Sequence, residues 1–311
     1  ELNLGRSWVR WNFEGYESRV GDDTGGGWEE QRALTATMLS IAEERGCGRL
    51  LWEYNSDLVR YGTPMALMLL PHWTDGCIGS MEGLYFEAST STPYHFLMQS
   101  ELSIAPSRAQ RGLPYRSFDL DAGVDHLEQF GVPYYAAFSE RAVTEGRAHP
   151  DLTELATSGP WTVFAVAGAE MVVPLGVEPV VFVGVDHAAW LDPSVEVFQK
   201  GSSAVPRTIG GPDHWQRVAP GELPERRHLP PVIVTEIATG VDSISFHVDR
   251  VGVPVMVRTS FFPNWEVSGA DGPWRATPNL MVVVPTGNDV TLTYGRTGVD
   301  MVAILLTLFG L

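Results

Sequence analysis

Lysine, cysteine and long apolar runs are scarce in this chain of 311 residues. Lysine occurs once, at Lys200, and 21 Lys and Arg residues face 38 Asp and Glu, which gives a formal net charge of −17. Such a charge repels phosphate backbones and anionic lipid surfaces, so we expect no nucleic-acid partner. The opening residues have no basic segment followed by an apolar one, and no run reaches the ~18–20 apolar residues that cross a bilayer. The sequence therefore predicts neither a signal peptide nor a complete transmembrane helix.

The motifs of common active sites are also missing. The eight histidines include no His-X-X-X-His pair, no Gly-X-Ser-X-Gly is present, and the glycines at 25–27 are not followed by Gly-Lys-Ser/Thr. Asp119 and Asp121 imitate an Asp-X-Asp metal motif, but they precede an amphipathic segment, where an aspartate caps a helix. The sequence predicts no metal ion and no cofactor.

The two cysteines, Cys47 and Cys77, lie 30 positions apart beside glycines. Neither has a second cysteine or a histidine at zinc-site spacing. They are either two buried free thiols or one disulfide, and we expect the disulfide, since an extracytoplasmic location would permit it.

Residues 1–167 are predicted to form an α/β domain with a mixed sheet. A helix–Gly–strand unit is clearest at 119–138, where Gly131 ends an amphipathic helix before an apolar strand. The chain also holds 22 Pro, 32 Gly and 10 Trp, which is typical of a loop-rich and β-rich fold. The spacing predicts helices over 28–46, 93–102, 119–130 and 142–155, and strands over 48–54, 132–138 and 161–166.

Residues 168–300 have a different residue pattern. Short β-branched runs recur between Pro, Gly and Asp-Gly turns, a pattern that indicates an antiparallel β-sandwich of jelly-roll type. Within this domain, residues 192–230 have few periodic apolar positions and are expected to form a long ordered connection. The overall fold class is therefore α+β or α/β, with a mixed-sheet domain followed by a β-sandwich.

Residues 301–311 read Met-Val-Ala-Ile-Leu-Leu-Thr-Leu-Phe-Gly-Leu and carry no charge. By pattern alone they are either a buried terminal strand or the start of a transmembrane helix.

Polar and aromatic residues gather between positions 52 and 101. Two carboxylates beside aromatics are what a glycoside hydrolase needs, so Glu82 with Glu87 or Glu101 is a candidate catalytic pair. The same residue types can line a saccharide groove, in which aromatic rings stack on sugars and polar groups bind hydroxyls, or can form a structural hydrogen-bond network. The candidate glycan-binding residues are Trp52, Glu53, Tyr54, Glu82, Tyr85, Glu87, Tyr94, His95 and Gln99.

Segments in three parts of the chain resemble known groups of proteins. The stretch FFPNWEVSGADG at 261–272, with PTGNDVTLTYGRTGVD at 285–300 and the apolar run after it, resembles the last extracytoplasmic module of YfhO-like membrane proteins, which are related to glycosyltransferases of the C fold. LEQFGVPYYAAFS at 127–139 and WTVFAV at 161–166 resemble the α/β part of the same group. Residues 50–89 resemble a branch of bacterial membrane proteins described as related to 6-pyruvoyl-tetrahydropterin synthase, although the clustered zinc histidines of that synthase have no counterpart here.

The resemblance implies a function in the cell envelope. The intact protein would transfer a sugar from a polyprenyl-phosphate donor at the extracytoplasmic face of the membrane, with its catalytic acid in a loop absent from this chain. The chain would then be inactive alone, and would bind or position a glycan acceptor or a lipid-linked sugar beside its own transmembrane domain. Residues 301–311 would begin a transmembrane helix. Two alternatives stay open: a self-contained glycoside hydrolase, and a structural domain that docks a partner membrane protein.

Overall fold

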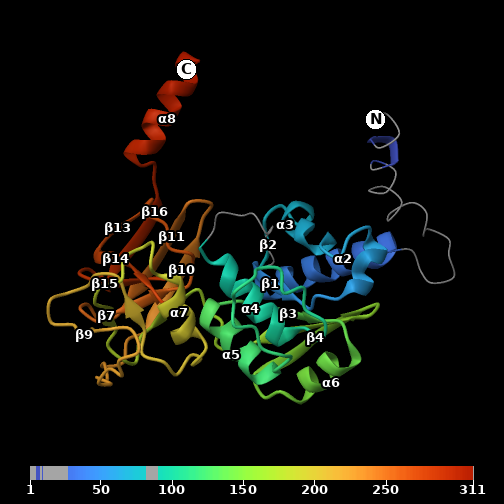
Figure 1. Cartoon of the computed structure of the whole chain (residues 1–311), viewed down its shortest axis with the longest axis horizontal. Coiled ribbons are helices and arrows are strands. Elements are labelled where there is room, and N and C mark those ends of the chain that lie inside the picture. Colours follow the sequence, from blue (N-terminus) through green and yellow to red (C-terminus); the bar gives the residue numbers. More distant parts are fainter. Residues whose placement is uncertain (1–4, 8, 10–26, 82–89, 311) are drawn as a thin grey trace. The chain divides into compact units, whose positions relative to one another are not determined.

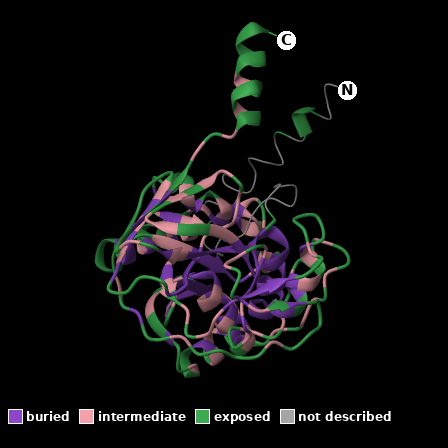
Figure 2. Ribbon diagram, turned by 90° about the vertical axis from the view of Figure 1, so that its left-hand side faces the viewer, coloured by how far each residue is buried: buried purple, intermediate pink, exposed green. Residues whose placement is uncertain are grey.

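The computed structural model describes residues 5–7, 9, 27–81 and 90–310. The chain divides into two compact units, Glu1–Ala169 and Glu170–Leu311, which we describe separately (Figure 1). Buried residues concentrate in the sheets, as the purple ribbon of Figure 2 shows. Each unit therefore has a hydrophobic core of its own.

The first unit is built on a mixed five-stranded sheet in the order β2-β1-β3-β5-β4. β1 pairs in parallel with β2 and β3, whereas β5 pairs antiparallel with β3 and β4. β3 and β5 are buried almost throughout, as expected of strands covered on both faces. The strands are β1 (Gly48–Trp52), β2 (Ile78–Ser80), β3 (Tyr134–Ala137), β4 (Leu152–Ser158) and β5 (Trp161–Val166).

Helices and short 3-10 turns connect these strands. α2 buries Leu34, Met38 and Ile41, which recur three and four positions apart and so share one helix face. This face belongs to a core that also contains Trp52 and Trp161. The helical elements are α2 (Gly27–Arg45), η1 (Ser56–Tyr61), η2 (Ala66–Leu69), α3 (Leu70–Trp73), α4 (Thr92–Leu102), α5 (Leu120–Phe130) and α6 (Glu140–Ala148).

The residues at the two ends of α5 predicted its position correctly. The side chain of Asp119 accepts a hydrogen bond from the N–H of Ala122, so the predicted N-cap is confirmed. Gly131 ends the helix with φ 62° and ψ 49°, a left-handed conformation that glycine adopts without steric penalty. The predicted helix over 93–102 is confirmed as α4, in which every residue except His95 is buried.

The predicted helix over 142–155 is wrong in its second half. α6 ends at Ala148, and Leu152–Ser158 forms β4, which pairs with β5 at the edge of the sheet. Pro150 explains the break, because proline has no amide hydrogen and disfavours helical backbone in the residue before it.

The second unit contains two sheets. One has seven strands in the order β6-β12-β15-β14-β8-β7-β9, and the other has four in the order β10-β11-β16-β13. Both are antiparallel except that β7 pairs in parallel with β8 and with β9. The strands are β6 (Val172–Pro174), β7 (Val180–Phe182), β8 (Arg207–Thr208), β9 (Arg217–Val218), β10 (Val234–Thr239), β11 (Ser243–Val248), β12 (Val255–Val257), β13 (Trp265–Ser268), β14 (Ala270–Ala276), β15 (Leu280–Pro285) and β16 (Asp289–Tyr294).

The two sheets of the second unit share one core. Phe246 and Leu292 from the four-stranded sheet belong to the same buried cluster as Val255 and Met281 from the seven-stranded sheet. The predicted fold class, a mixed-sheet α/β part followed by a β-sandwich part, is confirmed. The segment 192–230 is structured in places, because it contains β8, β9 and most of α7 (Leu191–Phe198).

Residues 298–309 form α8 (Gly298–Phe309), and none of them is buried. Thr297 and Asp300 form a capping box at the start of the helix. Asn264 Nδ2 donates to Asp300 Oδ2 and to the carbonyl oxygen of Gly295, both at 3.0 Å, which ties the start of α8 to the loop before β13. The buried-strand alternative is therefore wrong for residues 301–309, which are helical and not buried.

Cys47 and Cys77 form the predicted disulfide. The bond joins the turn between α2 and β1 to the start of β2, where the N–H of Gly48 also donates to the carbonyl oxygen of Cys77 at 3.0 Å. The disulfide therefore reinforces the point at which the parallel β1–β2 pair begins.

Candidate functional site

The predicted site residues at the carboxyl end of β1 are largely enclosed by the protein. Trp52 and Glu53 have no exposed surface, and Tyr54 is half-buried. Nε1 of Trp52 donates to Ser80 Oγ at 3.4 Å, and the N–H of Tyr54 donates to Ser103 Oγ at 2.9 Å. The carboxyl ends of parallel strands are where α/β proteins place ligands, but here Trp52 and Glu53 are directed into the fold.

Glu53 is a buried carboxylate whose partners are backbone amides. Its Oε2 accepts hydrogen bonds from the N–H groups of Phe138 at 2.7 Å and Ser139 at 2.8 Å, and its Oε1 accepts one from Ile104 at 3.4 Å. Ser139 is the N-cap of α6, so the carboxylate fixes the connection from β3 to that helix. Burial, and secondarily the charge of Glu53, raises the pKa of Tyr135 well above its ordinary value.

The predicted site residues on α4 are also mostly buried. Tyr94, Gln99 and Glu101 have no exposed surface, whereas His95 is half-buried. Gln99 Oε1 accepts hydrogen bonds from the N–H of Ser107 at 2.9 Å and from its hydroxyl at 2.7 Å. Gln99 therefore holds the loop after α4.

Glu101 forms a buried pair with His126. Glu101 Oε2 lies 2.6 Å from His126 Nδ1, with both side chains 1% exposed, and Arg116 Nη1 lies 3.5 Å from Glu101 Oε1. A carboxylate and an imidazole in contact can exchange a proton, but these two are enclosed between α4 and α5. Glu82, Tyr85 and Glu87 lie outside the described residues, so the catalytic Glu pair stays a prediction.

We expect His95 to stay uncharged far below the ordinary pKa of imidazole. Its Nδ1 is buried without a hydrogen-bond partner among the described residues. Burial, and secondarily the charge of Arg49, lowers the pKa of His95 to about 3. In the unfolded chain the His95 ring gains a proton near pH ~6.5, whereas in the folded chain it does so only near pH 3. The free energy of unfolding therefore falls as the pH drops from ~6.5 to about 3. An NMR titration of the His95 ring will measure this directly.

His247 supplies the matched control for that titration. Its Nδ1 lies 2.8 Å from Asp289 Oδ1 at the surface of the second unit, and this hydrogen bond raises the pKa of His247. The pKa of His95 should therefore lie below the ordinary value for imidazole, and the pKa of His247 above it. A His95 ring that protonates near pH 6.5 would contradict the buried environment described for it.

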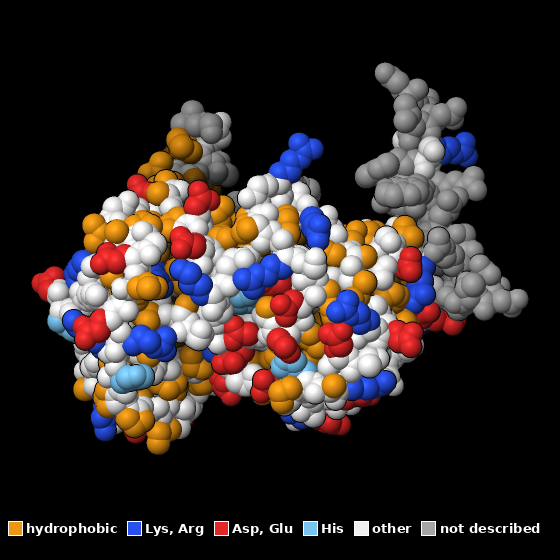
Figure 3. Space-filling view, turned by 60° about the horizontal axis from the view of Figure 1, so that its bottom comes forward, with side chains coloured by type: hydrophobic (Ala, Val, Ile, Leu, Met, Phe, Trp, Pro, Cys, Tyr) orange, Lys and Arg blue, Asp and Glu red, His pale blue; other side chains and the backbone are white. Residues whose placement is uncertain are grey.

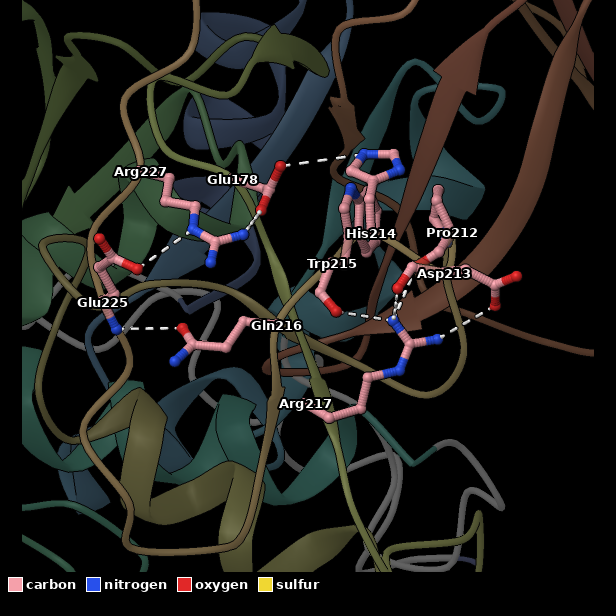
Figure 4. Close-up of polar contacts among 9 residues, drawn as sticks. All are labelled: Glu178, Pro212, Asp213, His214, Trp215, Gln216, Arg217, Glu225 and Arg227. Carbon is pink, nitrogen blue, oxygen red and sulfur yellow. Dashed lines mark hydrogen bonds and ion pairs between the residues drawn. The ribbon is translucent and has the colours of Figure 1, made fainter.

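A polar cluster in the second unit fastens the loop between β8 and β9 (Figure 4). Glu178 Oε1 lies 3.3 Å from Arg227 Nη1, and its Oε2 lies 3.9 Å from His214 Nε2. The guanidinium of Arg217 donates mainly to backbone carbonyls, which belong to Gly211, Pro212, Asp213 and Trp215. These contacts close a loop, and we assign the cluster a structural role.

A pocket of about 280 Å³ opens beside α2 in the first unit. Its walls include Trp28 and Trp73, whose ring centroids are 5.9 Å apart with planes at 68°. Trp28, Gln31, Arg32 and Thr35 repeat at helical spacing along a side of α2 that borders its buried stripe, to which Gln31 itself belongs. The sequence analysis followed only the apolar positions of that stripe and so missed them. The lining residues are Trp28, Gln31, Arg32, Thr35, Ala36, Leu39 and Trp73.

α8 is the most apolar exposed element in the described part of the chain. Val299 and Leu308 are 78% and 76% exposed, and Met301, Val302, Leu305, Leu306 and Phe309 are at least 46% exposed. Figure 2 draws most of the helix as exposed. Among the described residues, no helix is both long and apolar enough to cross a bilayer.

Charges of both signs share the face of the molecule that Figure 3 draws. On the face drawn in Figure 3, Lys and Arg side chains are interspersed with Asp and Glu and form no continuous basic patch. Within the described residues, no group of three or more His, Cys, Asp or Glu side chains is placed to hold a metal ion.

Comparisons with protein-family models, with curated proteins and with solved structures give no match for this chain. The function must therefore be argued from the chain's own geometry.

Proposed function

We propose that this chain is the extracytoplasmic part of a membrane glycosyltransferase-like protein of the bacterial cell envelope, where it binds or positions a glycan acceptor. In this proposal the transfer of sugar from a polyprenyl-phosphate donor belongs to a part of the intact protein outside these 311 residues. The observation that carries the membrane assignment is α8, in which Thr307 is the one polar residue between positions 301 and 309 and no residue is buried.

The chemistry of α8 suits hydrocarbon better than water. A helix that is hydrophobic all round is normally buried in a protein core or in a membrane, and α8 has no buried residue. Between positions 301 and 309 its one polar side chain is Thr307, whose hydroxyl donates back to the carbonyl oxygen of Ala303 at 2.8 Å. The helix thus presents no unsatisfied side-chain donor to lipid.

The base of α8 has the composition of a membrane–water interface. Tyr294 packs edge-on against Trp265 at 5.2 Å and against Phe262 at 6.3 Å. Tyr and Trp collect at such interfaces because their rings are apolar while one atom forms hydrogen bonds. With 12 residues, α8 is roughly 18 Å long, so these residues alone would enter a ~30 Å hydrocarbon layer rather than cross it.

The disulfide and the net charge support an extracytoplasmic location. Disulfides persist in oxidising compartments and are rare in the cytosol, and Cys47 is bonded to Cys77. A net charge of −17 disfavours attraction to anionic lipid headgroups, so attachment would depend on α8.

We expect the full chain to bind zwitterionic phosphatidylcholine vesicles, which carry no net charge, and the variant Leu305→Arg to lose that binding. A charged side chain near the centre of an inserted helix costs about 2.5–3.5 kcal/mol on insertion scales, equivalent to a loss of roughly 100-fold in vesicle affinity. Co-sedimentation over a range of lipid concentrations will measure the change. Because Leu305 is 51% exposed, the melting temperature should not move.

Val241→Arg is the matched control, because Val241 is fully exposed between β10 and β11 and the substitution is of the same kind. This variant should bind vesicles as the unaltered chain does. If the chain ignores vesicles and instead forms dimers that Leu305→Arg disrupts, α8 docks another protein helix and the assembly role replaces the membrane assignment.

The glycan part of the proposal favours binding over hydrolysis. Glu101, the one hydrolase candidate among the described residues, is enclosed with His126 and holds no open position for a sugar. The pocket beside α2, by contrast, combines exposed indole surface with a few polar side chains, which is the composition of small-molecule binding sites and suits the apolar faces and hydroxyls of a sugar.

A further inference from the structure

Gln31 is a buried amide with an unused acceptor. Its side chain lines the pocket beside α2, and the residue is 2% exposed. Nε2 donates to the carbonyl oxygen of Ala66 at 3.5 Å, whereas Oε1 has no hydrogen-bond partner in the part of the chain that the structure describes. A buried acceptor without a partner destabilises a fold, so its persistence in a cavity wall points to a ligand that donates to it.

The walls around this acceptor offer a surface for a ring. Trp73 is 45% exposed although it is one of the largest apolar side chains. Its ring is braced by His72 at 4.9 Å and by Trp28 at 5.9 Å, so the exposed indole is held in place. A preorganised aromatic face beside a small cavity loses little entropy when it binds a flat apolar surface.

The charge of the pocket selects among ring-shaped ligands. Arg32 belongs to the lining, which contains no carboxylate, and within the described residues Arg32 has no ion pair. Thr35 donates its hydroxyl to the carbonyl oxygen of Gln31 at 2.9 Å, and its oxygen can still accept a hydrogen bond. A guanidinium pairs well with carboxylate or phosphate and repels a cation.

We propose that this pocket binds a single sugar ring that carries a carboxylate or a phosphate. The apolar face of the ring lies on Trp73, a ring hydroxyl donates to Gln31 Oε1, and the anionic group pairs with Arg32. A volume of 280 Å³ is at the lower limit of the ~300–1,000 Å³ typical of ligand sites, which suits one ring rather than several. The assignment rests on the proposed glycan-binding function and gives that function a place and a sugar class.

Binding of glucuronate, glucose 6-phosphate and glucose to the full chain, measured by calorimetry and by saturation-transfer NMR, tests the assignment. Glucuronate and glucose 6-phosphate should bind saturably, with glucose at least tenfold weaker, because an ion pair with Arg32 adds to the ring contacts. Gln31→Met removes the acceptor at similar volume and should weaken all three sugars by about tenfold. Arg32→Gln should abolish the preference for the charged sugars.

Two variants on neighbouring surface serve as controls. Arg45→Gln removes an exposed guanidinium from the other end of α2, and Leu69→Ala removes an exposed apolar side chain outside the pocket; both variants should bind sugars with the affinity of the unaltered chain.

The stacking surface is tested by Trp73→Ala. This variant should lose sugar binding without lowering the melting temperature by more than a few degrees, since the ring is half exposed.

The outcomes separate the pocket from the wider function. Saturable sugar binding that none of the pocket variants changes would overturn the pocket assignment and leave the glycan function in place. No saturable binding of these sugars or of envelope polysaccharides would overturn both. If benzoate binds with the same affinity as glucuronate, the sugar hydroxyls do not contribute to binding. That result would overturn the assignment of the ligand as a sugar.

Discussion

Glu53→Leu should destabilise the first unit by about 3–5 kcal/mol, although no ligand is involved. The carboxylate accepts short hydrogen bonds from the N–H groups of Phe138 and Ser139, and hydrogen bonds to a charged group contribute roughly 1.5–3 kcal/mol each. Leucine fills a similar volume but accepts nothing, so these amides at the start of α6 lose their partner. Urea unfolding followed by hydrogen exchange in β3 and α6 will measure the change.

The second unit and a surface glutamate act as controls for this prediction. Amides of β12 and β15 belong to another core and should keep their protection in Glu53→Leu. Glu44→Leu replaces an exposed glutamate on α2 and should alter stability by less than about 0.5 kcal/mol. Glu53→Gln keeps one oxygen acceptor, so its loss of stability should lie between those of Glu53→Leu and Glu44→Leu. Equal stability of Glu53→Leu and the unaltered chain would refute the anchoring role.

Glu53 also illustrates what the sequence could not predict. It was predicted to contact a glycan because it lies beside Trp52 and Tyr54 in a polar-aromatic segment. Its actual partners are backbone amides 85 and 86 positions away, and no side-chain pattern records such contacts. A buried acid therefore looks the same in the sequence whether it meets a sugar or the protein's own backbone.

Where the signal was local, the sequence was sufficient. Asp119 and Gly131 bracket α5 because a cap and a left-handed stop act within one turn of the helix. The β-branched runs after position 168 predicted strands for the same reason, since alternation and turns are short-range properties. The strand β4 was missed because its apolar positions also fit a helical spacing, and only pairing with β5 decides between the two.

The pocket beside α2 was missed for a different reason. The apolar positions of α2 predicted its buried face, but Gln31, which is also buried there, is polar and gave no such signal. Trp28, Gln31, Arg32 and Thr35 repeat at helical spacing along the side of α2 that borders its buried stripe, so a signal was present in the sequence. Trp73, however, comes from α3, more than 40 positions later, and the cavity exists only where the two helices meet.

Reducing the Cys47–Cys77 bond should lower the stability of the first unit by about 3–4 kcal/mol, because the bond closes a loop with a sequence separation of 30 and so restricts the unfolded chain. For a unit of this size, that corresponds to a drop in melting temperature on the order of 10 °C. Cys47 is exposed, so dithiothreitol can reach the bond without prior unfolding. Calorimetry with and without reductant will measure the shift.

The double variant Cys47→Ala/Cys77→Ala provides the control, since it should melt near the temperature of the reduced chain and should not respond to reductant. The chain has no other cysteine, so no thiol can substitute for either partner. Intact-mass measurement should show both thiols blocked to alkylation until reduction; two alkylated thiols in the unreduced chain would refute the bond.

The stability that the disulfide adds also allows a test of the proposed extracytoplasmic location. A fold that depends on this bond should be recovered in higher yield after export to an oxidising compartment than from a reducing cytosol, whereas the cysteine-free variant should be recovered equally from both.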